Sequence, residues 1–433
     1  MLKNKLISFL KDGFVKKSIK VLFLRVGGVI LFFTLTLFLT NFFPTEEVGK
    51  YDFTRSILLI IGGLCLLGMD QSIIYFSGAL KSSDQLGELK RVYKKMLTMV
   101  LGMSLTVFLI FLIIPNHLIA SFFNKEEAPK LIFNTVLSIG AFAITLLNID
   151  TLRALQKPFF SELYRNIYRH LSFLILAIII FFSHQTFWLT EVFLASFFFL
   201  AMTSSVRVYL AFKKHKEYNP QGLYSHKAIF IRSYPMALSS VSYFLMQSID
   251  IVLLSKFTTF ETVAYYAAAV KIATVTSLVL LSVNIIAGPK IAEFYTNNDK
   301  EALKSIVKKS SRLILMFSIP AILFLFIFSE FILSLFGEHF VKAKYVLWVL
   351  LLGQFIRSLS GPIAIYMNMT GKQNRMHQFL FLGLGINILL NWIFIPKFGM
   401  QGAAYATVIS IFVWSGLAVV YAYKKDKIKT FIS

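Results

Sequence analysis

Twelve apolar runs, each about as long as a membrane-spanning helix, constrain this chain more than any other feature. A helix needs about 20 apolar residues to cross the hydrocarbon core of a bilayer. The chain of 433 residues is only 15% charged, whereas soluble domains carry about 25% charged residues. These features exclude a soluble globular protein and predict an all-α integral membrane protein. The runs lie at 19–42, 53–79, 96–114, 131–152, 168–183, 187–211, 234–257, 262–288, 313–336, 344–366, 377–395 and 401–423.

The positive charges are distributed very unevenly between alternate connections. Of the 44 Lys and Arg residues, 33 fall at the termini and in the even-numbered connections, 8 in the odd-numbered connections and 3 inside the runs. Cytoplasmic loops of membrane proteins are enriched in Lys and Arg. The split therefore predicts a multi-pass protein with both termini in the cytoplasm. Most of the formal net charge of +23 therefore belongs to Lys and Arg residues that set the orientation and face anionic lipid headgroups. We expect no nucleic-acid partner.

The two halves of the sequence resemble each other weakly. The matching pairs are 48–51 with 263–266, 89–95 with 303–309, 119–123 with 332–336 and 156–157 with 371–372, at offsets of 213 to 215 residues. Six spans per half make a parallel repeat. We expect an N-terminal six-helix lobe at 1–212, a cytoplasmic linker at 213–233 and a C-terminal six-helix lobe at 234–433. Two such lobes around a cleft are the architecture of an alternating-access transporter.

Motifs concentrated in the second half resemble the polysaccharide-export branch of the MATE-like MOP superfamily. They are Tyr234-Pro235, SIDIVL at 248–253, VAYY at 263–266, PKIAE at 289–293, GEHFVKA at 337–343, MTGK at 369–372, NILLN at 387–391 and IPKFGMQGAA at 395–404. The resemblance implies a MATE/MOP-like transporter fold of about twelve transmembrane helices. It also implies a Wzx-type flippase, which moves undecaprenyl-diphosphate-linked oligosaccharide units across the bacterial cytoplasmic (inner) membrane for O-antigen, lipopolysaccharide or capsule synthesis.

Two other functions stay open at this point. The first alternative is a MATE-like multidrug or cation antiporter on the same fold, and the less favoured one is a membrane polysaccharide polymerase. The seven histidines lack metal-ligand spacing and the chain has no phosphate-binding loop motif, so we expect no enzyme, no metal and no cofactor. H⁺ or Na⁺ is left open as a coupling ion. The partners implied are the lipid-linked oligosaccharide and membrane lipids, with other polysaccharide-assembly membrane proteins left open.

Four basic residues inside or near the spans are candidates for binding the substrate diphosphate. A charge inside a membrane is costly and normally faces a cavity or a partner. Guanidinium and ammonium groups suit phosphate oxygens. The four are Arg25, Arg55, Lys271 and Arg357. Related lipid-precursor flippases keep basic residues on the first, second and eighth spans, and the first three of these residues fall there.

Two acidic residues, Asp70 and Asp250, lie most nearly inside spans. Their depths along the helices predict the pairs Arg25–Asp70 and Asp250–Lys271. These pairs either fix helix packing or couple transport to an ion. For coupling, a diphosphate that competes for Lys271 would leave the Asp250 carboxylate free to take up a proton.

Polar residues near these charges are predicted to line the cavity. Ser240, Tyr243 and Gln247 share a helix face with Asp250 at helical spacing. Further candidates are Thr274 after Lys271 and Gln354 before Arg357. The alternative is hydrogen bonding between helices, which we favour for Asn387 and Asn391.

Overall fold

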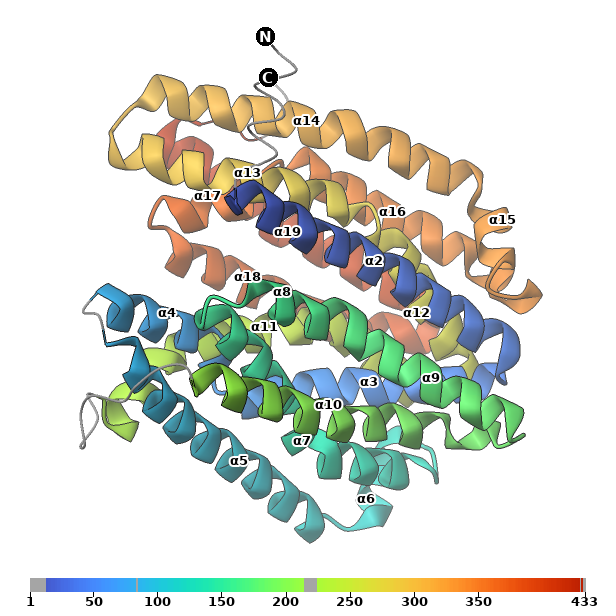
Figure 1. Cartoon of the computed structure of the whole chain (residues 1–433). Coiled ribbons are helices and arrows are strands. Elements are labelled where there is room, and N and C mark those ends of the chain that lie inside the picture. The colour runs from blue at the N-terminus through green and yellow to red at the C-terminus, as the bar shows by residue number, and fades with distance from the viewer. Residues whose placement is uncertain (1–12, 83–84, 214–223, 429, 431–433) are drawn as a thin grey trace. The chain divides into compact units, whose positions relative to one another are not determined.

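The computed structural model describes residues 13–82, 85–213, 224–428 and 430, and this part of the chain is helical, without a strand (Figure 1). Eleven helical stretches within it are long and apolar enough to cross a membrane, or up to twelve when the bent pair α3–α4 is counted as one span. The prediction of an all-α protein with about twelve spans is therefore confirmed.

The chain divides into two compact units, residues 1–244 and 245–433. Helices of the first unit are α2 (Gly13–Phe42), α3 (Thr45–Cys65), α4 (Met69–Ser82), α5 (Leu89–Ile113), α6 (Asn116–Phe123), α7 (Ala128–Ala154), α8 (Pro158–Glu162), the π-helix η2 (Leu163–Tyr168), α9 (Arg169–Phe182), α10 (Leu189–Phe212) and the first part of α11 (His226–Phe257). The short 3₁₀ turns η1 (Leu86–Glu88) and η3 (Thr186–Trp188) precede α5 and α10.

The second unit takes up the rest of α11 and the remaining helices. They are α12 (Phe260–Thr274), α13 (Ser277–Thr296), α14 (Lys300–Ile327), α15 (Ser329–Ser334), the 3₁₀ helix η4 (Glu338–Ala343), α16 (Lys344–Leu359), α17 (Ile363–Met369), α18 (Gln373–Phe398) and α19 (Met400–Asp426). Here α18 and α16 both pack along α19, and α13 packs along α14.

The order of elements in each unit follows the predicted repeat. The second apolar stretch of each half is interrupted, between α3 and α4 and again between α12 and α13, and a short helix, α6 or α15, follows the third span. The division of the units falls inside α11, while residues 226–233 of the predicted linker are helical and 214–223 lie outside the described residues. The predicted lobe boundaries at 212 and 234 stay a prediction.

The interruption between α3 and α4 is sharp and tightly packed. The two helices bend by 42°, and the backbone is left-handed at Leu67 (φ 51°) and Gly68 (φ 72°). A Cβ atom on Gly68 would lie 2.3 Å from the backbone nitrogen of Ala237 and 2.5 Å from the carbonyl oxygen of Ser233. Only glycine fits both the backbone conformation and the contact with α11.

Buried polar side chains hold the long helices of the first unit together. Tyr93 on α5 donates to Asn148 Oδ1 on α7 at 2.6 Å, and Asn148 Nδ2 donates to Ser204 Oγ on α10 at 2.9 Å. Water is absent from a bilayer core, so polar groups there must find partners within the protein. This network therefore specifies which faces of α5, α7 and α10 meet.

Candidate functional site

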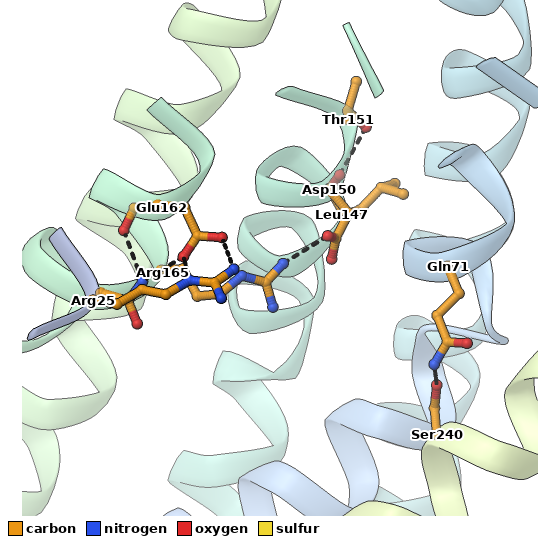
Figure 2. A network of polar contacts seen from close by, with 9 residues as sticks. Arg25, Gln71, Leu147, Asp150, Thr151, Glu162, Arg165 and Ser240 are labelled. Atoms are coloured by element: carbon orange, nitrogen blue, oxygen red, sulfur yellow. Dashed lines mark hydrogen bonds and ion pairs between the residues drawn. The ribbon is translucent and has the colours of Figure 1, made fainter. Parts of the chain in front are cut away.

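Arg25 is held by a carboxylate that the sequence did not indicate. Its Nη2 lies 2.7 Å from Glu162 Oε1 and its Nε lies 3.0 Å from Glu162 Oε2 (Figure 2). Asn166 also donates to Glu162 Oε2 at 2.8 Å. The predicted Arg25–Asp70 pair is therefore wrong. The physical reason is the close packing of α2 at Gly28. A Cβ atom on Gly28 would lie only 2.5 Å from the Cβ atom of Asn166, and this close approach places Glu162 opposite α2.

A second ion pair follows one turn further along the same helix. Arg165 in the π-helix η2 donates through Nη2 to Asp150 Oδ1 on α7 at 2.6 Å, and Figure 2 shows it extending from the neighbourhood of Glu162 towards α7. Asp70 at the start of α4 interacts electrostatically with Asp150 and Arg165. Its Oδ1 is buried and has no hydrogen-bond partner among the described residues. Asp70 thus joins a different charge network from the predicted one.

The fifth span is longer than its apolar run. It extends over Pro158–Phe182, whereas the sequence predicted a start at residue 168 and assigned Arg165 and Arg169 to a cytoplasmic connection. Both arginines lie within this helical stretch, and their position relative to the membrane stays a prediction. Arg169 is half-buried and repels the positive charge of Arg55, which is half-buried on α3.

The Asp250 carboxylate is the centre of a polar cluster in the second unit. Asn391 Nδ2 donates to its Oδ1 at 2.7 Å, Tyr266 OH donates to its Oδ2 at 3.1 Å, and Thr407 Oγ1 makes a short hydrogen bond to the same oxygen. Asn391 also donates to Asn387 Oδ1 at 3.1 Å. We call these five residues, from α11, α12, α18 and α19, the Asp250 cluster. Four of them are buried, and Thr407 is half-buried.

The partners that the structure gives Asp250 are the neutral groups of this cluster, and the Asp250–Lys271 pair stays a prediction. Depth along the helices explains why Tyr266 contacts Asp250. Helix α12 begins at Phe260, which places Tyr266 six residues and Lys271 eleven residues below its start. At about 1.5 Å per residue, Tyr266 meets the level of Asp250 and Lys271 lies about 7 Å deeper. Lys271 itself is buried, with 7% of its surface exposed.

The remaining candidates fall into different environments. Ser240 is buried and accepts a hydrogen bond from Gln71 Nε2 at 2.8 Å (Figure 2), whereas Tyr243 is 59% exposed and Gln247 is also exposed. The predicted polar stripe of α11 is therefore buried at its ends and exposed between them.

The other candidates lie on α12 and α16. Thr274 Oγ1 donates to the carbonyl of Lys271 at 2.8 Å, and Gln354 Oε1 accepts from Ser277 at 2.9 Å. Arg357 is half-buried on α16.

Several residues of these networks escaped the sequence analysis. Glu162 lies before the run at 168–183, while Arg169 lies at its first turn and is counted with the preceding connection; no local signal distinguishes either residue from a loop charge. Asn387 and Asn391 carried a signal, since their spacing of four places them on one helix face. They were assigned to hydrogen bonding between helices, and Asn391 does bond Asp250 on another helix. Tyr266 lies in the VAYY motif at 263–266, which does not indicate its contact with Asp250, and Thr407 lies in no motif.

Two family models match the chain. The family described as polysaccharide biosynthesis protein matches residues 14–294, and the MatE family matches residues 235–393. The probable low-salt glycan biosynthesis flippase Agl15 of Haloferax volcanii is 25% identical over 185 residues, covering 42% of this chain and 39% of that protein. The capsular polysaccharide biosynthesis protein CapF of Staphylococcus aureus is 24% identical over 201 residues, covering 46% and 50%. The chain thus matches half or less of the length of these relatives.

Solved structures share the fold over nearly the whole chain. The lipid II flippase MurJ in an inward closed conformation is 16% identical with a TM-score of 0.71, covering 94% of this chain and 87% of that one. An inward-facing multidrug resistance MATE transporter of the MOP superfamily is 15% identical with a TM-score of 0.73, covering 92% and 94%. The predicted MATE/MOP-like fold is confirmed. Agl15 and both structures are named as flippases or transporters.

Proposed function

Because the chain belongs to the polysaccharide biosynthesis protein family of the MOP superfamily, we propose that it is a flippase for lipid-linked oligosaccharides. Agl15 is named as a probable flippase of glycan biosynthesis, and CapF as a protein of capsular polysaccharide biosynthesis. The finer proposal is an undecaprenyl-diphosphate-linked unit, moved by alternating access across a bacterial cytoplasmic membrane for O-antigen or capsule synthesis. The 33-to-8 split of Lys and Arg supports termini in the cytoplasm.

The observation that carries this proposal is the set of arginines inside the spans of the family-matched part of the chain. Arg25, Arg55, Arg165 and Arg169 lie on α2, α3, η2 and α9. A cation at this depth is expensive and marks a substrate pathway or a fixed partner. Arginine binds phosphate oxygens in a two-point geometry, which a diphosphate offers and an uncharged drug does not. We propose Lys271 and Arg357 as further contacts to the substrate, with Ser240, Tyr243, Gln247, Thr274 and Gln354 as polar lining.

The Asp250 cluster is our candidate for ion coupling. A carboxylate, two amide side chains and two hydroxyls meet there, and the oxygen atoms of such groups suit hard cations such as Na⁺. Asn391 Oδ1 is buried without a hydrogen-bond partner among the described residues, which leaves it available to a cation. Alternatively, Asp250 itself takes up a proton. In either case the charge at Asp250 would change as transport proceeds.

A multidrug or cation antiporter is the second candidate, and one observation favours it. The MatE family model matches residues 235–393, which contain Asp250, Tyr266, Asn387 and Asn391. An antiporter of this kind would use the Asp250 cluster without needing the arginines of the first unit. Replacing those arginines therefore discriminates between the two functions.

The experiment is to delete the gene and locate the lipid-linked oligosaccharide across the cytoplasmic membrane. A flippase predicts that the oligosaccharide accumulates on the cytoplasmic leaflet and that surface glycan is lost. An antiporter predicts unchanged surface glycan together with hypersensitivity to cationic drugs. Single units that reach the outer face without being polymerised would instead indicate a polymerase. Complementation with Arg25→Ala should fail for a flippase and succeed for an antiporter.

A further inference from the structure

The apolar run at 344–366 forms two helices rather than one. Residues 360–362 separate α16 from α17, and within them Gly361 has a left-handed backbone (φ 62°) and is followed by Pro362. Glycine and proline are common causes of a break in a helix, and a few residues at such a break can absorb the backbone rotation of a hinge. Arg357 lies one turn before the break, on α16. A change at the break would therefore move α17 relative to the helix that carries Arg357.

The segment that follows α19 covers this break. Helix α19 ends at Asp426, where the left-handed backbone of Lys427 (φ 56°) stops the helix. Thr430 is fully buried, and a Cβ atom on Gly361 would collide with its carbonyl oxygen. Ser311 Oγ on α14 donates to the same carbonyl oxygen at 2.6 Å. The break thus leaves room for this carbonyl only because glycine occupies it.

Two further contacts tie the same segment to α17. Ile428 is 4% exposed and belongs to the buried apolar cluster that contains Ile363, the first residue of α17. The Asp426 carboxylate accepts a hydrogen bond from Tyr366 OH on α17 at 2.6 Å. It also pairs with Lys372 Nζ, in the turn after α17, at 2.7 Å. We define the α19 clamp as the residues Asp426, Ile428 and Thr430.

The contacts of the α19 clamp are of a kind that can open. Thr430 Oγ1 is buried and has no hydrogen-bond partner among the described residues, so docking costs this hydroxyl its hydration. The single proton of Ser311 Oγ is shared between the carbonyls of Thr430 and Val307. Asp426 keeps 20% and Lys372 10% of its side chain exposed, so water competes for their ion pair. Such a segment can detach by local opening while α19 stays folded.

We propose that the α19 clamp is a brake on the second unit. Docked, it ties α17 to α14 and α19 and fixes the break at Gly361. Alternating access requires spans to move, so the clamp must release in each transport cycle, and its release limits the rate. This inference goes beyond the proposed flippase function, because it holds for whatever the chain transports. A loosened clamp speeds transport and a locked clamp stops it, whereas a purely structural segment would never open.

Thiol labelling measures the opening without any substrate. The full chain is placed in nanodiscs, where both faces meet solvent, after Cys65 is replaced. Thr430→Cys should react with N-ethylmaleimide about tenfold or more slowly than the exposed Lys427→Cys, and about tenfold or more faster than Ala422→Cys, which is fully buried on α19. Asp426→Asn should speed labelling at position 430 and leave it unchanged at 422. Equal rates at 430 and 422 would overturn the proposal, because the clamp would then open only when the helix unfolds.

A reversible lock tests the brake itself. Lys372→Cys and Asp426→Cys in one chain are joined by a bismaleimide with a cleavable disulfide in its spacer, which takes the place of the lysine side chain. In proteoliposomes the locked protein should lose nearly all transport of lipid-linked oligosaccharide, and reductant should restore it to the wild-type rate or above. Each single variant treated with the same reagent is the matched control and should transport at least as fast as the wild type. Undiminished transport by the locked protein would overturn the proposal.

The failure of the clamp and the failure of the flippase give different results. If the wild type flips oligosaccharide and the locked protein flips it equally well, the inference fails and the flippase stands. If the wild type flips no oligosaccharide and instead transports a cationic dye such as ethidium, the flippase fails. The lock is then applied to dye transport, where loss on locking and recovery with reductant uphold the clamp and unchanged transport overturns it.

Discussion

Arg25 on α2 and Glu162 at the end of α8 lie 137 residues apart in the sequence and form a two-point ion pair. The Glu162 side chain is 7% exposed and the Arg25 side chain is 44% exposed. The carboxylate is therefore buried, while the guanidinium keeps a face that is open to a ligand. This asymmetry allows Arg25 to serve both packing and substrate binding.

The two roles of Arg25 separate in a neutral double variant. Arg25→Gln alone leaves the Glu162 carboxylate buried and should cost about 1–2 kcal/mol, less than a fully buried pair because Arg25 is partly exposed. Arg25→Gln with Glu162→Gln should recover most of that stability, measured by thermal unfolding in detergent. We expect glycan export to stay lost in the double variant. Export restored along with stability would show that Arg25 acts only in packing.

The Asp250 cluster predicts that ion flux depends on a single carboxylate. Asp250→Asn should abolish substrate-stimulated flux of H⁺ or Na⁺ in proteoliposomes that contain ion-sensitive dyes. Thr407→Val removes a hydrogen bond to the same carboxylate, which costs roughly 1.5–3 kcal/mol, and should weaken the flux. The control is Ser410→Ala on the same helix, whose hydroxyl bonds the carbonyl of Gly383 instead. If Asp250→Asn carries wild-type flux, Asp250 is a packing residue.

The break between α3 and α4 predicts opposite effects for two glycines. Gly68→Ala forces a left-handed alanine whose Cβ meets the backbone of α11, so we expect a loss of stability of about 3 kcal/mol or more. Gly78→Ala on α4 meets nothing within 4 Å and should be neutral or gain up to about 1 kcal/mol of helix propensity. Melting temperatures of the two variants would decide this. Equal melting temperatures would mean that the break relaxes without cost.

Topology is tested by labelling single cysteines from outside the cell, after the buried Cys65 is replaced. Asn124 is exposed after α6 and should label with an impermeant thiol reagent when replaced by cysteine. Asn297 is exposed after α13 and should be shielded, as should Asn219, which lies outside the described residues. Labelling at Asn297 without permeabilisation would invert the topology.

The number and type of the spans could be predicted, whereas the charge partners could not. An apolar run of the right length is a local property, so the runs at 96–114 and 131–152 correspond to α5 and α7. A partner depends on how each helix is rotated and where it begins. A fifth span that starts at 168 excludes Glu162, which is the partner of Arg25 in the structure. Depth along a helix carries no information about the face on which a side chain lies.

The most direct measurement is flipping by the purified chain in proteoliposomes that contain undecaprenyl-diphosphate-linked oligosaccharide. An impermeant reagent that modifies the sugar reaches only the outer leaflet, which holds about half of the lipid. We predict that nearly all of the oligosaccharide becomes accessible with the wild type, and that Arg25→Ala, Lys271→Ala and Arg357→Ala stay at half. Wild-type protein that stays at half while it transports a cationic drug would contradict the account.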